Sequence, residues 1–107
     1  MAPPTQETIT AAIAALRADA AGWLDSAADL AGAGDAAAAL TLRRGELSAM
    51  ADATGLTGVY AALQEHVAAR LGEAARAGSD TAAALGQAAE GYERDEHDAV
   101  HRLRGVW

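Results

Sequence analysis

Two long runs of residues spaced by steps of three and four constrain the fold of this chain most. The first run is Ile9, Ile13, Leu16, Ala20, Trp23, Ala27, Leu30, Gly34 and Ala37. The second is Tyr60, Leu63, Val67, Leu71, Ala74, Gly78, Ala82, Leu85, Ala89, Tyr92, Glu96, Val100 and Leu103. This spacing places each run along one face of a helix, and no alternating β pattern accompanies it. We therefore expect an all-α protein with two long helices.

Local signals set the expected helix ends. Pro3-Pro4-Thr5, with Thr5 as N-cap and Glu7 in the first turn, predicts the start of a helix over about residues 5–42. Basic residues followed by Gly45 predict its end. A connection over about residues 43–57 follows, with a short helix within 46–53. The turn Gly55, Leu56 and Gly58 leads into a second helix over about 58–103, and the 107 residues form a single helical-hairpin domain.

The composition predicts a thin core. About three residues in ten are alanine, which favours helix but buries little surface. A hairpin of two helices encloses no interior, so we expect it to pair with a second hairpin into a four-helix bundle. The sequence leaves open whether that partner is another copy, giving a homodimer, or a related protein, giving a heterodimer. The expected partner interface is Ile9, Ile13, Leu16, Trp23, Leu30, Leu63, Val67, Leu71 and Leu85.

Charge and residue usage exclude several functions. The net charge is −7, and the chain contains no lysine. A nucleic-acid ligand is therefore not expected, because phosphate binding relies on clustered basic residues. The absence of cysteine excludes disulfides, cysteine-ligated zinc and thiol catalysis. No apolar run is long enough to predict a membrane span, and the N-terminal segment lacks the charge pattern of a signal peptide.

The C-terminal histidines and carboxylates admit two interpretations. His97 and His101, with Glu93 one turn earlier, have the spacing of metal ligands on one helix face. The alternative is a polar helix end whose histidines interact with the helix dipole, and we favour it. The acids near residue 95 resemble a solvated face, because a thin hairpin offers no pocket for acid–base catalysis. We predict no cofactor, no metal and no enzymatic activity.

Tyr92-Glu93-Arg94-Asp95-Glu96 is the most informative segment. On a helix, Tyr92 and Glu96 share one face, so a partner protein finds an aromatic ring and a carboxylate one turn apart. Alternatively, Tyr92 is the last large residue of its run and Glu96 is a solvated helix acid.

The paired helices, the glycine-containing turn and Tyr92-x-x-x-Glu96 resemble the EspC-like family of type VII (ESX) secretion targets, actinobacterial relatives of the WXG100 hairpins. This resemblance implies a hairpin exported folded, usually as a dimer, with Tyr92 and Glu96 as a signal read by the secretion ATPase and Val100 as a flanking apolar contact. WXG100 proteins carry Trp-x-Gly at the turn, whereas this chain has Leu56-Thr57-Gly58. Its tryptophans are Trp23 and Trp107, which fits the EspC-like group better.

We therefore expect a non-enzymatic type VII secretion substrate or secretion-associated partner protein. It would be cytoplasmic before export and then secreted by a route independent of a signal peptide. The alternative is a cytoplasmic helical adaptor or immunity-type protein that binds one partner and is not exported.

Overall fold

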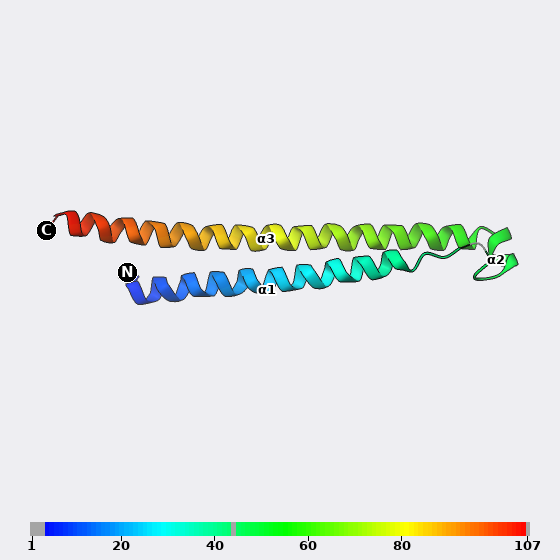
Figure 1. Ribbon diagram of the computed structural model, residues 1–107, viewed down its shortest axis with the longest axis horizontal. Helices are drawn as coiled ribbons and strands as arrows, with labels where there is room; N and C mark the ends of the chain where they lie inside the picture. The colour runs from blue at the N-terminus through cyan, green and yellow to red at the C-terminus, as the bar shows by residue number, and fades with distance from the viewer. Residues whose placement is uncertain (1–3, 44, 107) are drawn as a thin grey trace. The chain divides into compact units, whose positions relative to one another are not determined.

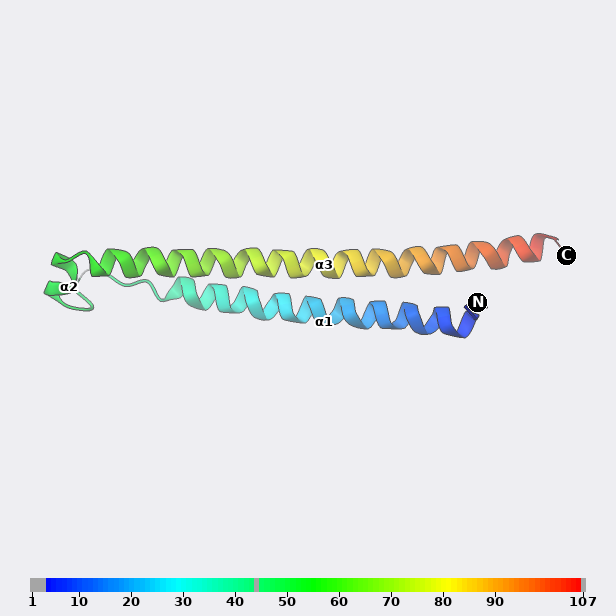
Figure 2. The same cartoon turned by 180° about the vertical axis from the view of Figure 1, so that it is seen from behind.

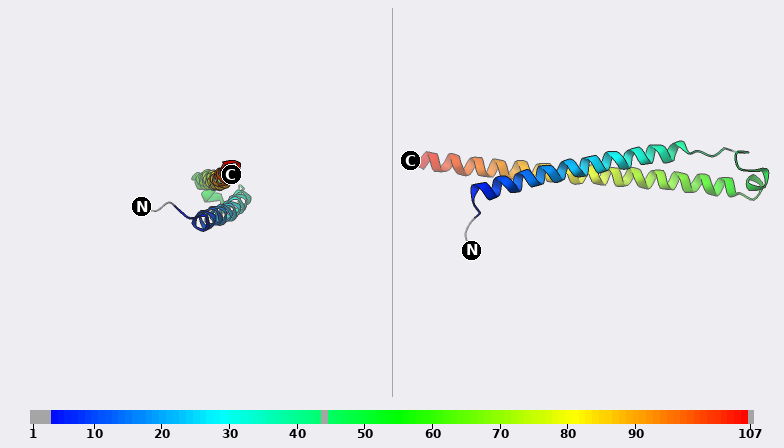
Figure 3. Two further views of the ribbon diagram at one scale, coloured as in Figure 1. Left: turned by 90° about the vertical axis from the view of Figure 1, so that its left-hand side faces the viewer. Right: turned by 90° about the horizontal axis from the view of Figure 1, so that it is seen from below.

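The structure, a computed structural model, describes residues 4–43 and 45–106. In this part of the chain it consists of three helices, α1 (Gln6–Ala39), α2 (Ala49–Ala53) and α3 (Leu56–Val106), with no strand. The long helices α1 and α3 pack against each other as a hairpin, drawn from the front in Figure 1, from behind in Figure 2 and turned by 90° in Figure 3. The predicted all-α helical hairpin is confirmed.

The start of α1 follows the predicted cap. The Thr5 hydroxyl accepts a hydrogen bond from the backbone N–H of Thr8 at 3.1 Å, which satisfies one of the free donors of the first turn. Glu7 lies in that turn, where the helix dipole favours an acidic side chain. The helix then continues through Gly32 and Gly34 without a break.

The end of α1 comes at Ala39, three residues before the predicted end. Here the Gln64 side chain of α3 donates hydrogen bonds to the carbonyl oxygens of Ala37 at 2.9 Å and Ala38 at 2.8 Å. The carbonyls of a last helical turn lack α-helical partners. Here the Leu40 N–H also donates to Ala37 at 3.2 Å and the Thr41 hydroxyl to Ala38 at 3.1 Å, so Gln64 shares in capping this end. Leu42, the predicted last residue, and Arg43 therefore follow the helix, and Arg44 lies outside the described residues.

The Gln64→Ala variant is expected to lose about 1–2 kcal/mol of unfolding free energy, because two helix-end hydrogen bonds disappear. Urea denaturation followed by circular dichroism measures this change. Gln87→Ala is the matched control, since Gln87 is an exposed glutamine of the same helix. An equal loss in both variants would show that the Gln64 contacts contribute nothing specific.

The side chain of Asp52 holds together the connection between α1 and α3. The two carboxylate oxygens of Asp52 accept hydrogen bonds from the Thr57 hydroxyl at 2.6 Å and from the Gly45 N–H at 2.9 Å. Ser48 caps α2 by accepting from the Ala51 N–H at 3.0 Å. Gly55 has a φ of 83°, which favours glycine. The predicted short helix is therefore present but shorter.

The predicted turn residues divide between two elements. Gly55 lies in the turn, while Leu56 is the first residue of α3 and Gly58 lies inside it. The second long helix therefore begins two residues earlier than predicted, and it continues to Val106, three residues beyond the predicted end.

By its contacts the chain divides into two compact units. Unit 1 comprises residues 1–25 and 78–107, and unit 2 comprises residues 26–77. In unit 1, Ile13 of α1 and Ala82 and Ala89 of α3 are buried. In unit 2, Gly34 lies against Leu71 while Ala37 is bound by Gln64, so the helices run antiparallel there.

Small residues form the contact between α1 and α3. Apart from Ile13 of α1 and Ala51 of α2, the buried apolar residues of the described part are Ala27, Ala75, Ala82 and Ala89. A methyl group on Gly34 would lie 3.4 Å from the Leu71 Cβ and 3.6 Å from the Ala68 carbonyl oxygen. The helix backbones therefore approach closely, which increases dispersion contact where side chains are short.

The contact face of α3 differs in part from the predicted run. Beyond Thr57, the half-buried residues of its first turns are Ala61, Gln64 and Ala68, one position later than the predicted Tyr60, Leu63 and Val67. Ala75 is buried in place of Ala74. Large side chains do not fit between backbones this close, so alanines take the contact and the larger residues lie beside it. From Gly78 to Ala89, prediction and structure coincide.

Candidate functional site

The first turns of α3 carry a second apolar face that the described part of the chain leaves exposed. We call it the α3 apolar face: Leu56, Val59, Tyr60, Leu63 and Val67, which are 41–66% exposed. At about 100° per residue, these positions share one arc of about 100°, turned by roughly 110° from Ala61, Gln64 and Ala68. Residues 56–64 include no charged side chain.

Unit 2 also exposes large apolar residues in the segment that precedes the α3 apolar face. Leu40, Leu47 and Met50 are also exposed, and Met50 reaches 76%. The only charged residue between positions 47 and 64 is Asp52, whose carboxylate is occupied by Thr57 and Gly45. Soluble monomers rarely expose contiguous apolar patches above a few hundred Å² unless the patch binds something. Its exposed apolar side chains make unit 2 a candidate docking region.

The residues predicted as a partner interface fall into two groups. Ile13 is buried, and Ile9, Leu16, Leu30, Leu71 and Leu85 are half-buried. Trp23, Leu63 and Val67 are exposed. The hairpin itself therefore covers part of the surface of the six residues in the first group. The surface that remains open includes Leu56, Val59 and Tyr60, of which only Tyr60 belonged to the predicted run.

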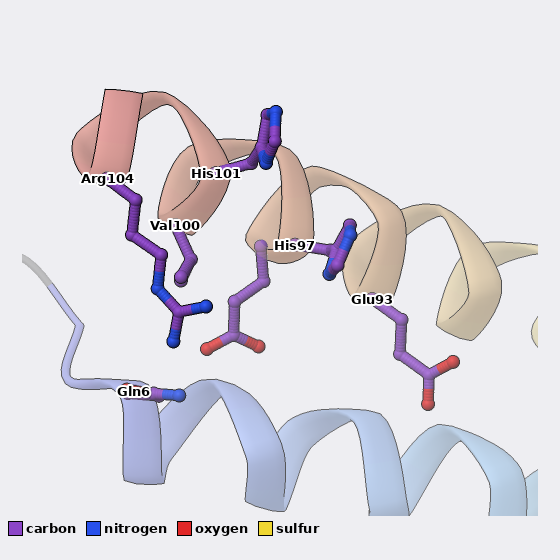
Figure 4. Close-up of a pocket in the computed structure, with 7 residues that line it drawn as sticks. Gln6, Glu93, His97, Val100, His101 and Arg104 are labelled. Carbon is purple, nitrogen blue, oxygen red and sulfur yellow. The ribbon is translucent and has the colours of Figure 1, made fainter. Parts of the chain in front are cut away.

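The predicted signal residues lie on successive turns of α3 in unit 1. Tyr92 is 56% exposed, whereas Glu96 and Val100 are half-buried. Glu96 and Val100 line a polar hollow of about 330 Å³, together with Gln6, Glu93, His97, His101 and Arg104. Val100 and Arg104 point toward Gln6 at the start of α1, and His101 points away from α1 (Figure 4).

Tyr92 borders a different hollow, which we call the Tyr92 groove. It has a volume of about 450 Å³ and is lined by Pro4, Thr8, Ile9, Ala12, Ala15, Leu16, Asp19 and Tyr92. All of these except Tyr92 lie in α1 or just before it. The ring of Tyr92 therefore stands beside α1, and the two predicted signal side chains border separate hollows.

An ion pair connects this part of α3 to α1. The Arg17 guanidinium donates to the Glu93 carboxylate at 2.7 Å, and both side chains are about half exposed (48% and 49%). An exposed pair of this kind contributes little to stability. It does hold Glu93, which lies between Tyr92 and Glu96 in the sequence, against α1.

The described residues show no grouping typical of a metal or catalytic site. No set of three or more histidines, cysteines or carboxylates within residues 4–43 and 45–106 is arranged to hold a metal ion. His97 and His101 are exposed. Across the same residues, no polar or charged side chain is buried.

None of the helices described combines the length and apolar character needed to cross a bilayer. Comparisons with family models, with curated proteins and with solved structures found no match for this chain.

Proposed function

We propose that this protein is a non-enzymatic substrate or secretion-associated partner of a type VII secretion system, exported folded without a signal peptide. The observation that carries the proposal is the placement of Tyr92 and Glu96. The Tyr92 ring is 56% exposed on α3, and Glu96 follows one turn later on the same unbroken helix. This pair matches the Y-x-x-x-E pattern on which the resemblance to EspC-like proteins depends.

The geometry supports recognition by another protein. An exposed tyrosine offers a large contact area with few rotatable bonds, which is typical of residues that dominate binding energy. The Glu96 carboxylate offers a charge-assisted hydrogen bond to an arginine or to backbone N–H groups of a secretion ATPase. Because α3 is continuous through Val100, the three side chains keep a fixed spacing before any partner binds. A fixed spacing lowers the entropy cost of binding.

The α3 apolar face supports pairing with a second helical hairpin. Its five side chains are exposed in the hairpin alone, and a four-helix bundle would cover them. A second copy and a related protein both satisfy this requirement.

Export of the Tyr92→Ala variant tests the signal. We expect secretion to fall about tenfold or more, the effect of losing a contact worth about 1.4 kcal/mol. Glu96→Ala should act in the same direction, and Tyr92→Phe should keep most export because it keeps the ring. The measurement is the ratio of protein in the medium to protein in cells of a host with an active type VII system.

Arg94→Ala is the matched control, because Arg94 is an exposed residue of the same segment and lines neither hollow. Export of Tyr92→Ala at the wild-type level would remove the signal role. If the wild-type protein also stays in the cell, the adaptor or immunity-type function becomes the better account.

A further inference from the structure

We infer that the Tyr92 groove binds a segment of a partner protein that presents an apolar side chain next to a basic one. The recognition surface then includes the first half of α1 as well as α3. The inference rests on the proposed function for one point, that the partner belongs to the export route. The chemistry of the partner comes from the groove itself.

The walls of the groove define an apolar anchor. Ile9 and Leu16 contribute aliphatic surface, and the exposed residues Ala12 and Ala15 leave space between them. The volume of about 450 Å³ lies within the roughly 300–1,000 Å³ typical of binding pockets. Short side chains also let an incoming backbone approach α1 closely, as the alanines between α1 and α3 already do.

The charges around the groove favour a basic partner. Asp19 is the charged residue among those that line it. Arg17, in the adjacent part of α1, is already bound to Glu93 at 2.7 Å. The sequence of unit 1 contains nine acidic residues and four arginines. A lysine or arginine near Asp19 is therefore attracted, whereas an acidic segment is repelled.

Most of the surface of the Tyr92 groove comes from α1. Apart from Tyr92, every lining residue belongs to α1 or directly precedes it. The C-terminal part of α3 alone therefore lacks most of this surface. A partner that uses the groove must recognise the folded hairpin, in agreement with export in the folded state.

A peptide titration of the full chain tests the groove directly. The probes are two fluorescein-labelled amphipathic peptides, one of leucine and lysine and one of leucine and glutamate, followed by fluorescence anisotropy. We expect the leucine–lysine peptide to bind and the leucine–glutamate peptide not to bind. Ala15→Arg should weaken binding about tenfold or more, because it fills the groove and repels a basic peptide.

Ala14→Arg is the matched control. It adds the same charge, and Ala14 is exposed and does not line the groove. It should leave the dissociation constant within about twofold. Circular dichroism should show the same helicity and melting temperature for both variants, because both positions are exposed. Equal weakening by Ala14→Arg and Ala15→Arg, or equal binding of the two peptides, would overturn the inference.

The export assay separates this inference from the proposed function. Retention of Ala15→Arg and Tyr92→Ala in the cell, with normal export of Ala14→Arg, supports both. Normal export of Ala15→Arg together with retention of Tyr92→Ala overturns the groove but leaves the signal intact. Normal export of Tyr92→Ala refutes the proposed function, and the peptide titration then decides the groove by itself.

Discussion

Replacing Ala89 with leucine is expected to lower the unfolding free energy by about 1–3 kcal/mol, the cost of overpacking a close contact. Ala89 is 0% exposed, the most fully buried residue among those that form the core. For a chain of this size the loss corresponds to a melting temperature lower by roughly 5–20 °C. Thermal denaturation followed at 222 nm measures it.

The physical reason is the small size of the residues between α1 and α3 in unit 1. A leucine at position 89 has no cavity to fill, so either the helices separate or the side chain adopts a strained rotamer. Ala88→Leu is the control, because Ala88 is exposed and keeps the same change in composition. If both variants melt at the same temperature, the contact is not close packed at Ala89.

The second large effect is expected at the α3 apolar face. Leu63→Glu should weaken pairing with a second hairpin a hundredfold or more, since burying an unpaired carboxylate in an apolar interface costs several kcal/mol. Leu63 is 59% exposed in the hairpin alone, so the isolated protein should keep its helicity and melting temperature. Weaker pairing with unchanged helicity and melting temperature would identify Leu63 as a docking residue and not a core residue.

Sedimentation or light scattering measures the pairing, for the 10.8 kDa chain alone and mixed with a related hairpin. Ala62→Glu is the matched control: it adds the same charge one residue away, at an exposed position outside the face. The docking role of the face is refuted if the two variants associate alike.

The sequence predicted the contact face of α1 better than that of α3. In α1 the largest apolar residues and the contact positions coincide, except that Trp23 and Leu24 remain 48% and 56% exposed. In α3 two faces with the same periodicity lie one residue apart. The pattern of hydrophobicity selects Tyr60, Leu63 and Val67, whereas close backbone packing selects Ala61 and Ala68. Periodicity alone cannot separate them, because both faces repeat at the same interval.

The ends of the helices depended on contacts that local sequence does not encode. Basic residues and Gly45 predicted an end near residue 42, but α1 ends at Ala39, where the side chain of Gln64, far along the chain, binds the last carbonyls. The role of Asp52 was also missed, although an aspartate beside a threonine and a glycine is a common turn-forming set.

At the candidate site, the sequence placed Tyr92 and Glu96 on one helix, and the structure adds the environment of each. Their separate hollows depend on how α1 lies against α3 in unit 1. The sequence did not predict that Ala12, Ala15 and Asp19 line the Tyr92 groove. Exposed alanines and a helix aspartate form no recognisable sequence motif, and the groove exists only once α3 lies against α1.

The Gln64 contact also bears on the alignment of the two helices in unit 2. Alanine and glycine present nearly the same surface every seven residues, so a slip of α1 by one heptad would preserve much of the burial. The Gln64 amide would then face the middle of α1, where the carbonyls already have helical partners. Only the observed register gives it the carbonyls of Ala37 and Ala38. One polar side chain thus selects a single alignment, as a buried asparagine does in coiled coils.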